Sequence, residues 1–353
     1  MSLKKAVEEM TSSASDTEAR KIRKERDTAI TQNLKLQTEL DALKRTLEVV
    51  ETLKDTRLDP PTWLSPTKPR IKGATLVVML SDLHLDEVVI PDEVDFLNAF
   101  NREIARMRLE RWAQNVIKLA RHHFNGVKYD GVVILLGGDI FSGDIHDELA
   151  ETNSDTILGS LHYWSEHLAA AIDMLLAEFG HGVVASVVGN HGRMSRKPRA
   201  KLRARTNFDW LLAKILERHF AKDKRVAFQV PEGADVLVNI YGQGHLMTHG
   251  DQASGGAGIG GIWPPVMRLR ARKAQRYLAV GANFQTLWMG HWHQYISTPS
   301  LVVNGSLKGV DEYSFIQNFG YEVPQQALAI VAPEKGIVVH APVFCQDRKR
   351  EGW

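Results

Sequence analysis

Five short polar clusters in the sequence contain the residue types that bind metal ions and transfer protons. They are Ser81-Asp82-Leu83-His84, Gly137-Gly138-Asp139, Gly189-Asn190-His191, Thr248-His249-Gly250-Asp251 and Gly290-His291-Trp292-His293. Each follows an apolar run, and open α/β sheets bind their ligands at the carboxyl ends of strands. One such cluster alone is weak evidence, because an isolated Gly-Asp turn or His-x-His is usually structural. Five in succession indicate one site.

The donor atoms available to a metal here are nitrogen and oxygen. Cys345 is the single cysteine of the 353 residues, so the sequence excludes an intramolecular disulfide and a cysteine-based zinc site. Histidine, carboxylate and amide donors without thiolate favour Mn, Fe or Zn. In an extended backbone the side chains of residues i and i+2 point the same way, so His291 and His293 are expected to face one cluster.

Apolar runs and helical patterns alternate from Ala74 onward, which predicts a layered α/β domain in which helices flank the β-sheets. The predicted strands are Thr75–Leu80, Gly131–Leu136, Gly182–Val188, Val236–Tyr241, His245–Thr248 and Gln285–Met289. The predicted helices are Ala99–His123, Thr156–Phe179, Asn207–Phe220 and Pro265–Val280. Three further strands without intervening helices, Ser300–Val303, Ala327–Val331 and Gly336–His340, predict an antiparallel closing section.

The order of the clusters, Asp-x-His, Gly-Asp, Gly-Asn-His, His and Gly-His-x-His, closely resembles the calcineurin-like metallophosphoesterase superfamily. This superfamily includes Mre11/SbcD-type nucleases, cyclic-nucleotide phosphodiesterases and Ser/Thr phosphatases. The resemblance covers roughly residues 74 to 295. It implies a dinuclear, metal-dependent phosphoesterase, with Mn as the expected metal and Fe or Zn as alternatives.

The resemblance also implies a role for each residue of the site. Asp139 would bridge two divalent ions. The first metal site would be completed by Asp82, His84 and His293, and the second by Asn190, His249 and His291. His191 would face the scissile phosphate and protonate the leaving oxygen after attack by a metal-activated hydroxide.

The sequence departs from the family at one position beside the catalytic histidine. Many members carry Asp or Glu immediately after it, where the carboxylate can orient the imidazole, whereas this chain has Gly192. We expect another carboxylate to take that part, with Asp86, Asp144 and Asp251 as candidates, or else a less tightly held His191.

A basic run begins two residues after His191. Residues 193–205 contain seven basic and no acidic side chains, and residues 268–276 contain five more. Basic side chains beside a phosphoesterase centre would contact the phosphates that flank the scissile bond. The predicted substrate contacts are Arg193, Arg196, Lys197, Arg199, Lys201 and His146.

Three functions remain open from the sequence. The first is a phosphodiesterase or nuclease that hydrolyses nucleic acid. The second is a phosphomonoesterase or protein phosphatase, because the motif does not depend on the substrate. The third is a coiled-coil scaffold with a vestigial metal domain. Nucleases of the resembled type often use an ATPase partner, which is a further expectation.

The N-terminal part differs in composition, and we predict three segments: a helical extension over 1–56, a proline-rich linker over 57–73 and the catalytic domain over 74–353. A heptad seam supports the extension, formed by Leu36, Leu40, Leu43, Leu47 and Val50. Its 11 basic and 11 acidic residues suit a solvent-exposed helix. Either the seam joins copies of the chain into a homo-oligomer, or the helix packs on its own domain.

The overall charge excludes a uniformly basic coat protein, since 44 Lys and Arg face 42 Asp and Glu, for a net +2. The two basic runs account for more than this excess, so the rest of the chain is net acidic. The sequence contains neither an apolar leader segment nor an apolar run of membrane-spanning length. We therefore expect a cytoplasmic protein without membrane attachment.

Overall fold

The computed structural model describes residues 26, 28–37, 40–41, 73–253 and 260–353. The chain divides into two units, Met1–Asp59 and Pro60–Trp353, and each is described by itself. In the first, the described residues are helical and exposed, including the seam residues Leu36 and Leu40. The seam residues Leu43, Leu47 and Val50, and the predicted linker up to residue 72, lie outside the described residues, so coiled coil and linker stay predictions.

Two β-sheets form the frame of the second unit. The first has six strands in the order β11-β10-β1-β2-β3-β4, and the second has five in the order β5-β6-β7-β9-β8. Strands of the first sheet are β1 (Ala74–Leu80), β2 (Tyr129–Leu136), β3 (Gly182–Ser186), β4 (Val226–Gln229), β10 (Gln325–Ala332) and β11 (Gly336–Phe344). Those of the second are β5 (Asp235–Ile240), β6 (Gln243–Thr248), β7 (Thr286–Met289), β8 (Ile296–Thr298) and β9 (Leu301–Val303).

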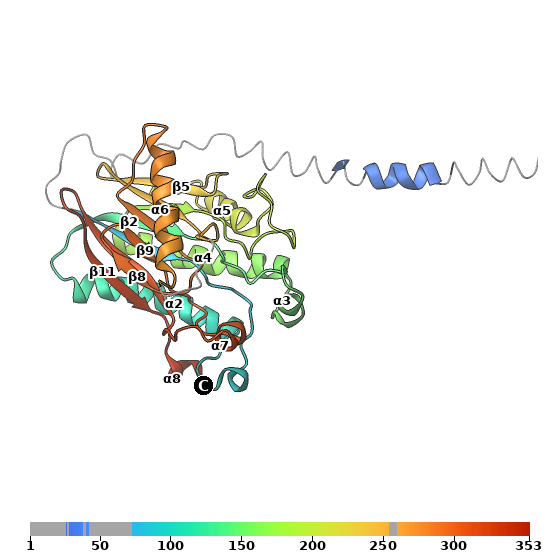
Figure 1. Cartoon of the computed structure of the whole chain (residues 1–353), viewed down its shortest axis with the longest axis horizontal. Coiled ribbons are helices and arrows are strands. Elements are labelled where there is room, and N and C mark those ends of the chain that lie inside the picture. The colour runs from blue at the N-terminus through green and yellow to red at the C-terminus, as the bar shows by residue number, and fades with distance from the viewer. Residues whose placement is uncertain (1–25, 27, 38–39, 42–72, 254–259) are drawn as a thin grey trace, which may run out of the picture. The chain divides into compact units, whose positions relative to one another are not determined.

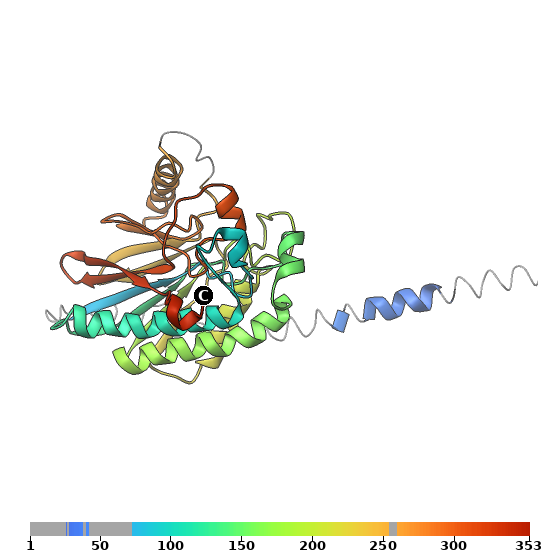
Figure 2. The same cartoon turned by 90° about the horizontal axis from the view of Figure 1, so that it is seen from below.

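Helices cover the outer face of each sheet, which gives four layers (Figures 1 and 2). The main helices are α2 (Arg102–Lys118), α4 (Ile157–Phe179), α5 (Phe208–His219) and α6 (Trp263–Leu278). Shorter ones are η1 (Pro91–Val94), η2 (Leu119–His123), α3 (Asp147–Thr152), α7 (Glu312–Ile316) and α8 (Arg348–Glu351). Helices α2 and α4 run side by side on one side of the molecule, and α6 lies on the opposite side (Figure 2).

The alternation of side chains along β1 explains the layers. Leu76 and Val78 face the helices α2 and α4, whereas Val77 and Met79 face the second sheet. Because successive side chains of a strand point to opposite faces, a strand that is apolar at every position must be covered on both sides. The predicted layered α/β fold is confirmed.

The directions of the strands bring the carboxyl ends of β1, β2, β3, β6 and β7 toward the site. Strands β1, β2, β3 and β4 are parallel, and so are β6, β7 and β9. The antiparallel closing section is confirmed for β10 and β11, since β10 pairs antiparallel with both β1 and β11. It was wrong for the strand predicted over Ser300–Val303, because β9 lies in the second sheet, parallel to β7, and α7 separates it from β10. Two short strands, β4 and β8, have no counterpart in the prediction because runs of three or four residues carry too little periodicity.

Some predicted boundaries were wrong. The strand predicted over Gly182–Val188 ends at Ser186, and the helix predicted over Ala99–His123 begins at Arg102. The side chain of Asn101 accepts a hydrogen bond from the backbone of Ile104 and so caps that helix. Among the described residues, no helix is long and apolar enough to cross a membrane.

The interface between the two sheets can be tested through Leu135, which is 1% exposed and packs there. We expect Leu135→Ala to lower the free energy of unfolding by about 2–5 kcal/mol, because it removes buried methyl groups and leaves a cavity. Urea denaturation measures the change. The control, Val338→Ala on the exposed side of β11, should stay within about 0.5 kcal/mol of the wild type. Equal losses in both variants would contradict the two-sided packing.

Candidate metal centre

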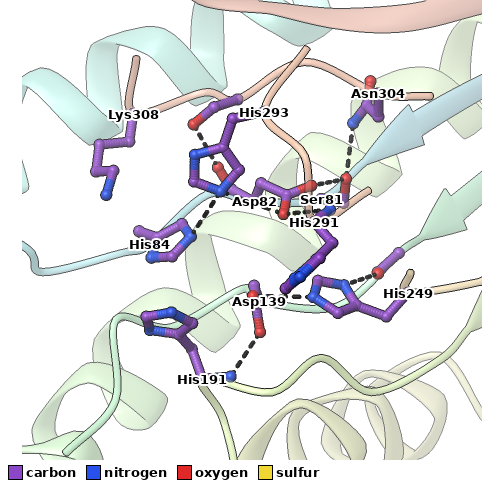
Figure 3. Close-up of polar contacts among 12 residues, drawn as sticks. Ser81, Asp82, His84, Asp139, His191, His249, His291, His293, Asn304 and Lys308 are labelled. Atoms are coloured by element: carbon purple, nitrogen blue, oxygen red, sulfur yellow. Dashed lines mark hydrogen bonds and ion pairs between the residues drawn. The ribbon is translucent and has the colours of Figure 1, made fainter. Parts of the chain in front are cut away.

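The five clusters meet at the carboxyl ends of the strands. Figure 3 shows this for Asp82, His84, Asp139, His191, His249, His291 and His293. Within the described residues, three groups of side chains have ligand atoms that all lie within 4.8 Å of one another. The groups are Asp82, His84 and His293; His84, Asp139 and His191; and Asp139, His249 and His291. These groups could each hold a metal ion, and they are linked through His84 and Asp139.

Acceptor atoms converge around His249, and this supports a cation site. The Nδ1 of His249 lies 2.9 Å from the backbone oxygen of Gly137, an atom that can only accept, so Nδ1 carries a proton. In the neutral ring, Nε2 is then a lone pair, 2.9 Å from an Asp139 oxygen and 3.1 Å from the Asn190 oxygen. Three acceptors at this distance need a proton or a cation between them. The donor set of this cradle therefore fits a divalent metal.

The charge state of His249 reflects the same convergence. Burial alone would lower its pKa, but the charge of the Asp139 carboxylate and the hydrogen bond to it raise the pKa to about 10. The neighbouring His291 differs: burial and the nearby His249 lower its pKa to about 4. His291 is thus a neutral imidazole at physiological pH, the form that binds metals.

The second half of the centre lies around Asp82 and His84. The Nε2 atoms of His84 and His293 are 3.2 Å apart, and Nε2 of His293 is 3.4 Å from an Asp82 oxygen. Burial, with the positive charge of Lys308 nearby, lowers the pKa of His84 to about 4. Burial would raise the pKa of Asp82, yet its interaction with His293 holds the pKa below the usual value. The charged carboxylate of Asp82 and the neutral imidazole of His84 again provide metal donors.

The His-x-His pair reaches the centre by a different backbone geometry from the one predicted. His291 and His293 have φ of 71° and 51°, so neither is extended. They also face different groups: His291 lies with Asp139 and His249, and His293 lies with Asp82 and His84. The extended backbone predicted for this pair was therefore wrong, although the two histidines divide between the ligand groups as the resemblance implied.

Left-handed backbone is concentrated at the site. Besides the two histidines, Asp82, His84 and Asp139 have φ of 54°, 46° and 49°. Such residues cost free energy and persist where surrounding contacts hold them. Backbone hydrogen bonds do so here: Asp82 donates to Gly138, and His84 donates to Asp139. The backbone of His291 donates to the Asp82 carboxylate at 2.8 Å.

A buried carboxylate that the sequence analysis missed, Asp209, clamps two of the loops. It lies in the first turn of α5 and accepts hydrogen bonds from the backbone of Asp139 (3.0 Å), Ile140 (3.2 Å) and Gly189 (2.9 Å). Burial, with the Asp139 carboxylate nearby, raises the pKa of Asp209 to about 6. Asp209 therefore fixes the relative position of the Asp139 loop and the loop that carries His191.

Asp209 also explains why residue 192 is a glycine. A Cβ at Gly192 would lie 2.5 Å from the Asn207 side chain and 2.8 Å from an Asp209 oxygen. The space beside His191 is therefore filled by side chains from the start of α5. The glycine at position 192 already indicated that the family's carboxylate is absent beside His191. The sequence does not show which side chains occupy that space instead.

The imidazole of His191 is oriented by backbone rather than by a carboxylate. Its Nδ1 donates to the Ser142 carbonyl at 2.9 Å, and its backbone N–H donates to Asp139 at 2.7 Å. The free ring nitrogen is Nε2.

The three carboxylates predicted to orient His191 were the wrong candidates. Asp86 binds Arg102, Ser160 and Trp164; Asp144 is exposed; and Asp251 pairs with Arg203. Asp86 and Asp251 are thus held by other partners.

Two buried networks of polar contacts hold the ligand side chains of His84 and Asp82 in place. Glu87 lies 3.2 Å from His84 Nδ1 and accepts from Lys308 at 2.7 Å, and Lys308 also pairs with Asp311. On the other side, Ser81 hydrogen-bonds the Asp82 carboxylate and accepts from Asn304 at 2.9 Å. Partners of this kind fix the tautomer and direction of a ligand.

The predicted substrate contacts have several different environments. Arg193 is not free, since its guanidinium donates to the backbone of Asn190, Ser195 and Arg196 and so braces its own loop. Arg196 pairs with Asp147, whereas Lys197, Arg199 and Lys201 are exposed. The exposed His146 has its ring centre 6.1 Å from that of His191.

The Asp209 clamp yields a prediction about metal affinity. The variant Asp209→Asn would turn an NH2 group toward backbone donors, so the loops should separate and affinity for Mn²⁺ or Zn²⁺ should fall about 10- to 100-fold. Calorimetric titration measures this. Asp173→Asn, which changes an exposed partner of Arg225 on α4, is the matched control. Unchanged affinity in Asp209→Asn would refute the clamp.

Comparison with known proteins shows likeness to solved structures alone. No family model matches the chain, and no curated protein matches it. Among solved structures, the chain is similar to the sulfate thiohydrolase SoxB of Thermus thermophilus in complex with glycerol, at 12% identity and a TM-score of 0.33. The match covers 78% of this chain and 58% of SoxB. The chain thus spans little more than half the length of that protein.

Proposed function

We propose that the protein is a metal-dependent phosphoesterase that hydrolyses phosphodiester bonds of nucleic acid. The observation that carries this proposal is the convergence of ligand atoms of Asp139, His249 and Asn190, where a divalent cation could replace the proton of His249, beside a second group of ligand atoms at Asp82, His84 and His293. Asp139 belongs to two of the ligand groups, which suits a carboxylate shared between two metals.

Each side chain then has a defined task. Bound divalent cations would polarise the phosphoryl group and lower the pKa of water. Asp82, His84, Asn190, His249, His291 and His293, together with the shared Asp139, would hold those cations. His191, held through Nδ1 by Ser142, keeps Nε2 available to give a proton to the departing oxygen.

The basic loop after His191 supports a polyanionic substrate. Lys197, Arg199 and Lys201 project into solvent a few residues from the centre, and Arg193 braces the loop that presents them. Lysine and arginine contacts to phosphates position a nucleic acid without reading its sequence. A smaller phosphomonoester would make no use of such an extended cationic rim.

A matrix of substrates and metals tests this function. With Mn²⁺ we expect cleavage of oligonucleotides and of bis(p-nitrophenyl) phosphate in preference to p-nitrophenyl phosphate. His191→Ala should lower kcat about 10²- to 10⁴-fold on oligonucleotides. A preference for the monoester would favour the phosphomonoesterase alternative. If no substrate turns over with Mn²⁺, Fe²⁺ or Zn²⁺, the proposal fails.

The basic rim makes a separate prediction about salt. Replacing Lys197, Arg199 and Lys201 by glutamine should weaken oligonucleotide binding and reduce the slope of log affinity against log salt by about 0.7–0.9 for each phosphate that the variant no longer neutralises. Fluorescence anisotropy at several salt concentrations measures the slope. The control replaces Lys128, Lys222 and Lys224, exposed lysines before the amino ends of β2 and β4. A slope altered equally in both variants would show that only net charge matters.

A further inference from the structure

A cluster of exposed aromatic side chains lies on the segment that contains α7. Tyr313 is 64% exposed and Phe319 is 56% exposed, and their ring centres are 6.0 Å apart in an edge-to-face contact. Ile316, at 77%, and Tyr321, at 48%, are exposed on the same segment. Large apolar side chains gathered in solvent mark binding surfaces in soluble proteins.

This cluster borders the metal centre. A hollow is lined by Ser314, Phe319 and Gly320 of this segment together with Trp292 and His293 of the loop after β7. His293 belongs to the Asp82 and His84 ligand group. A ring resting on Phe319 would therefore sit beside a phosphate held at the centre.

The segment is anchored at both ends, so the exposure of its rings is not a consequence of a loose loop. Asp311 caps α7 and pairs with the buried Lys308, which binds Glu87 and through it His84. Further along, the Glu322 carboxylate accepts from the backbone of Tyr295 at 2.9 Å. The backbone is tied to the metal centre, and the aromatic side chains are left outside.

We propose that Tyr313 and Phe319 form a stacking shelf for an unpaired nucleobase next to the scissile phosphate. This inference rests on the proposed function and narrows its substrate to single-stranded nucleic acid, because a base inside a duplex has no free face to stack. Proteins that bind single strands combine aromatic platforms with a basic groove. Here the shelf lies by His293, and the basic loop of Lys197, Arg199 and Lys201 follows His191.

Single-stranded oligonucleotides with one abasic position, scanned along the strand, test the shelf. The wild-type protein should bind and cleave the oligonucleotide with a full set of bases about 5- to 150-fold better than the one lacking the base at the shelf position. Phe319→Ala and Tyr313→Ala should remove this difference and leave cleavage of the abasic strand unchanged. Phe319→Trp should retain it, and Phe344→Ala, an exposed phenylalanine on β11, is the matched control.

The outcomes separate this inference from the function on which it rests. If strands are cleaved but no abasic position matters, or if Phe319→Ala leaves the difference intact, the shelf is refuted. If binding by anisotropy shows the difference but no strand is cleaved, the proposed hydrolysis fails and the shelf stands. If Phe319→Ala instead dissociates an oligomer in solution, the cluster is a contact between copies of the chain and the inference is overturned.

Discussion

Three carboxylates buried together impose the main constraint on this structure. Asp82, Asp139 and Asp209 are each at most 2% exposed, and burying charge without compensation is costly. Burial alone would raise the pKa of all three. The charge of His249 holds the pKa of Asp139 well below its usual value, whereas that of Asp209 rises to about 6. Asp209 is satisfied by three backbone donors, which leaves Asp139 and Asp82 as the carboxylates available to cations.

The carboxyl ends of strands from both sheets converge, and this places histidines from one sheet beside the buried carboxylates that follow the other. Strands β1, β2 and β3 supply Asp82, Asp139 and Asn190, while β6 and β7 supply His249 and His291. Left-handed residues at Asp82, Asp139 and His291 turn the chain sharply within two or three residues of the strand ends. Small residues allow this crowding: a Cβ at Gly138 would lie 2.4 Å from the backbone nitrogen of Gly189. The packing of the preceding strands thus offsets the free-energy cost of the left-handed backbone at the ligands.

The layered fold could be predicted from the sequence, and so could the meeting of the ligand candidates at the carboxyl ends of the strands. Both predictions rest on local signals, namely apolar runs and the polar residues that end them. The sequence did not reveal Asp209, Glu87 or Lys308. Asp209 reads as an ordinary acidic residue in the first turn of a helix, and its partners Asp139 and Ile140 are 70 and 69 residues away. Lys308 meets Glu87 across 221 residues. Contacts between distant segments leave no periodicity, so the supporting residues emerged only with the fold.

A buried series of contacts joins the rim of the site to its metal ligands: Lys308 forms ion pairs with Asp311 and Glu87, and Glu87 hydrogen-bonds His84. Lys308 is 2% exposed and neutralises two carboxylates at once. Removing one partner of a buried ion pair costs about 3–5 kcal/mol, because the other charge is left uncompensated. Loss of Lys308 would therefore leave two buried carboxylates uncompensated. Since Asp311 also caps α7, the aromatic side chains at the rim and His84 in the centre are positioned by the same buried charge.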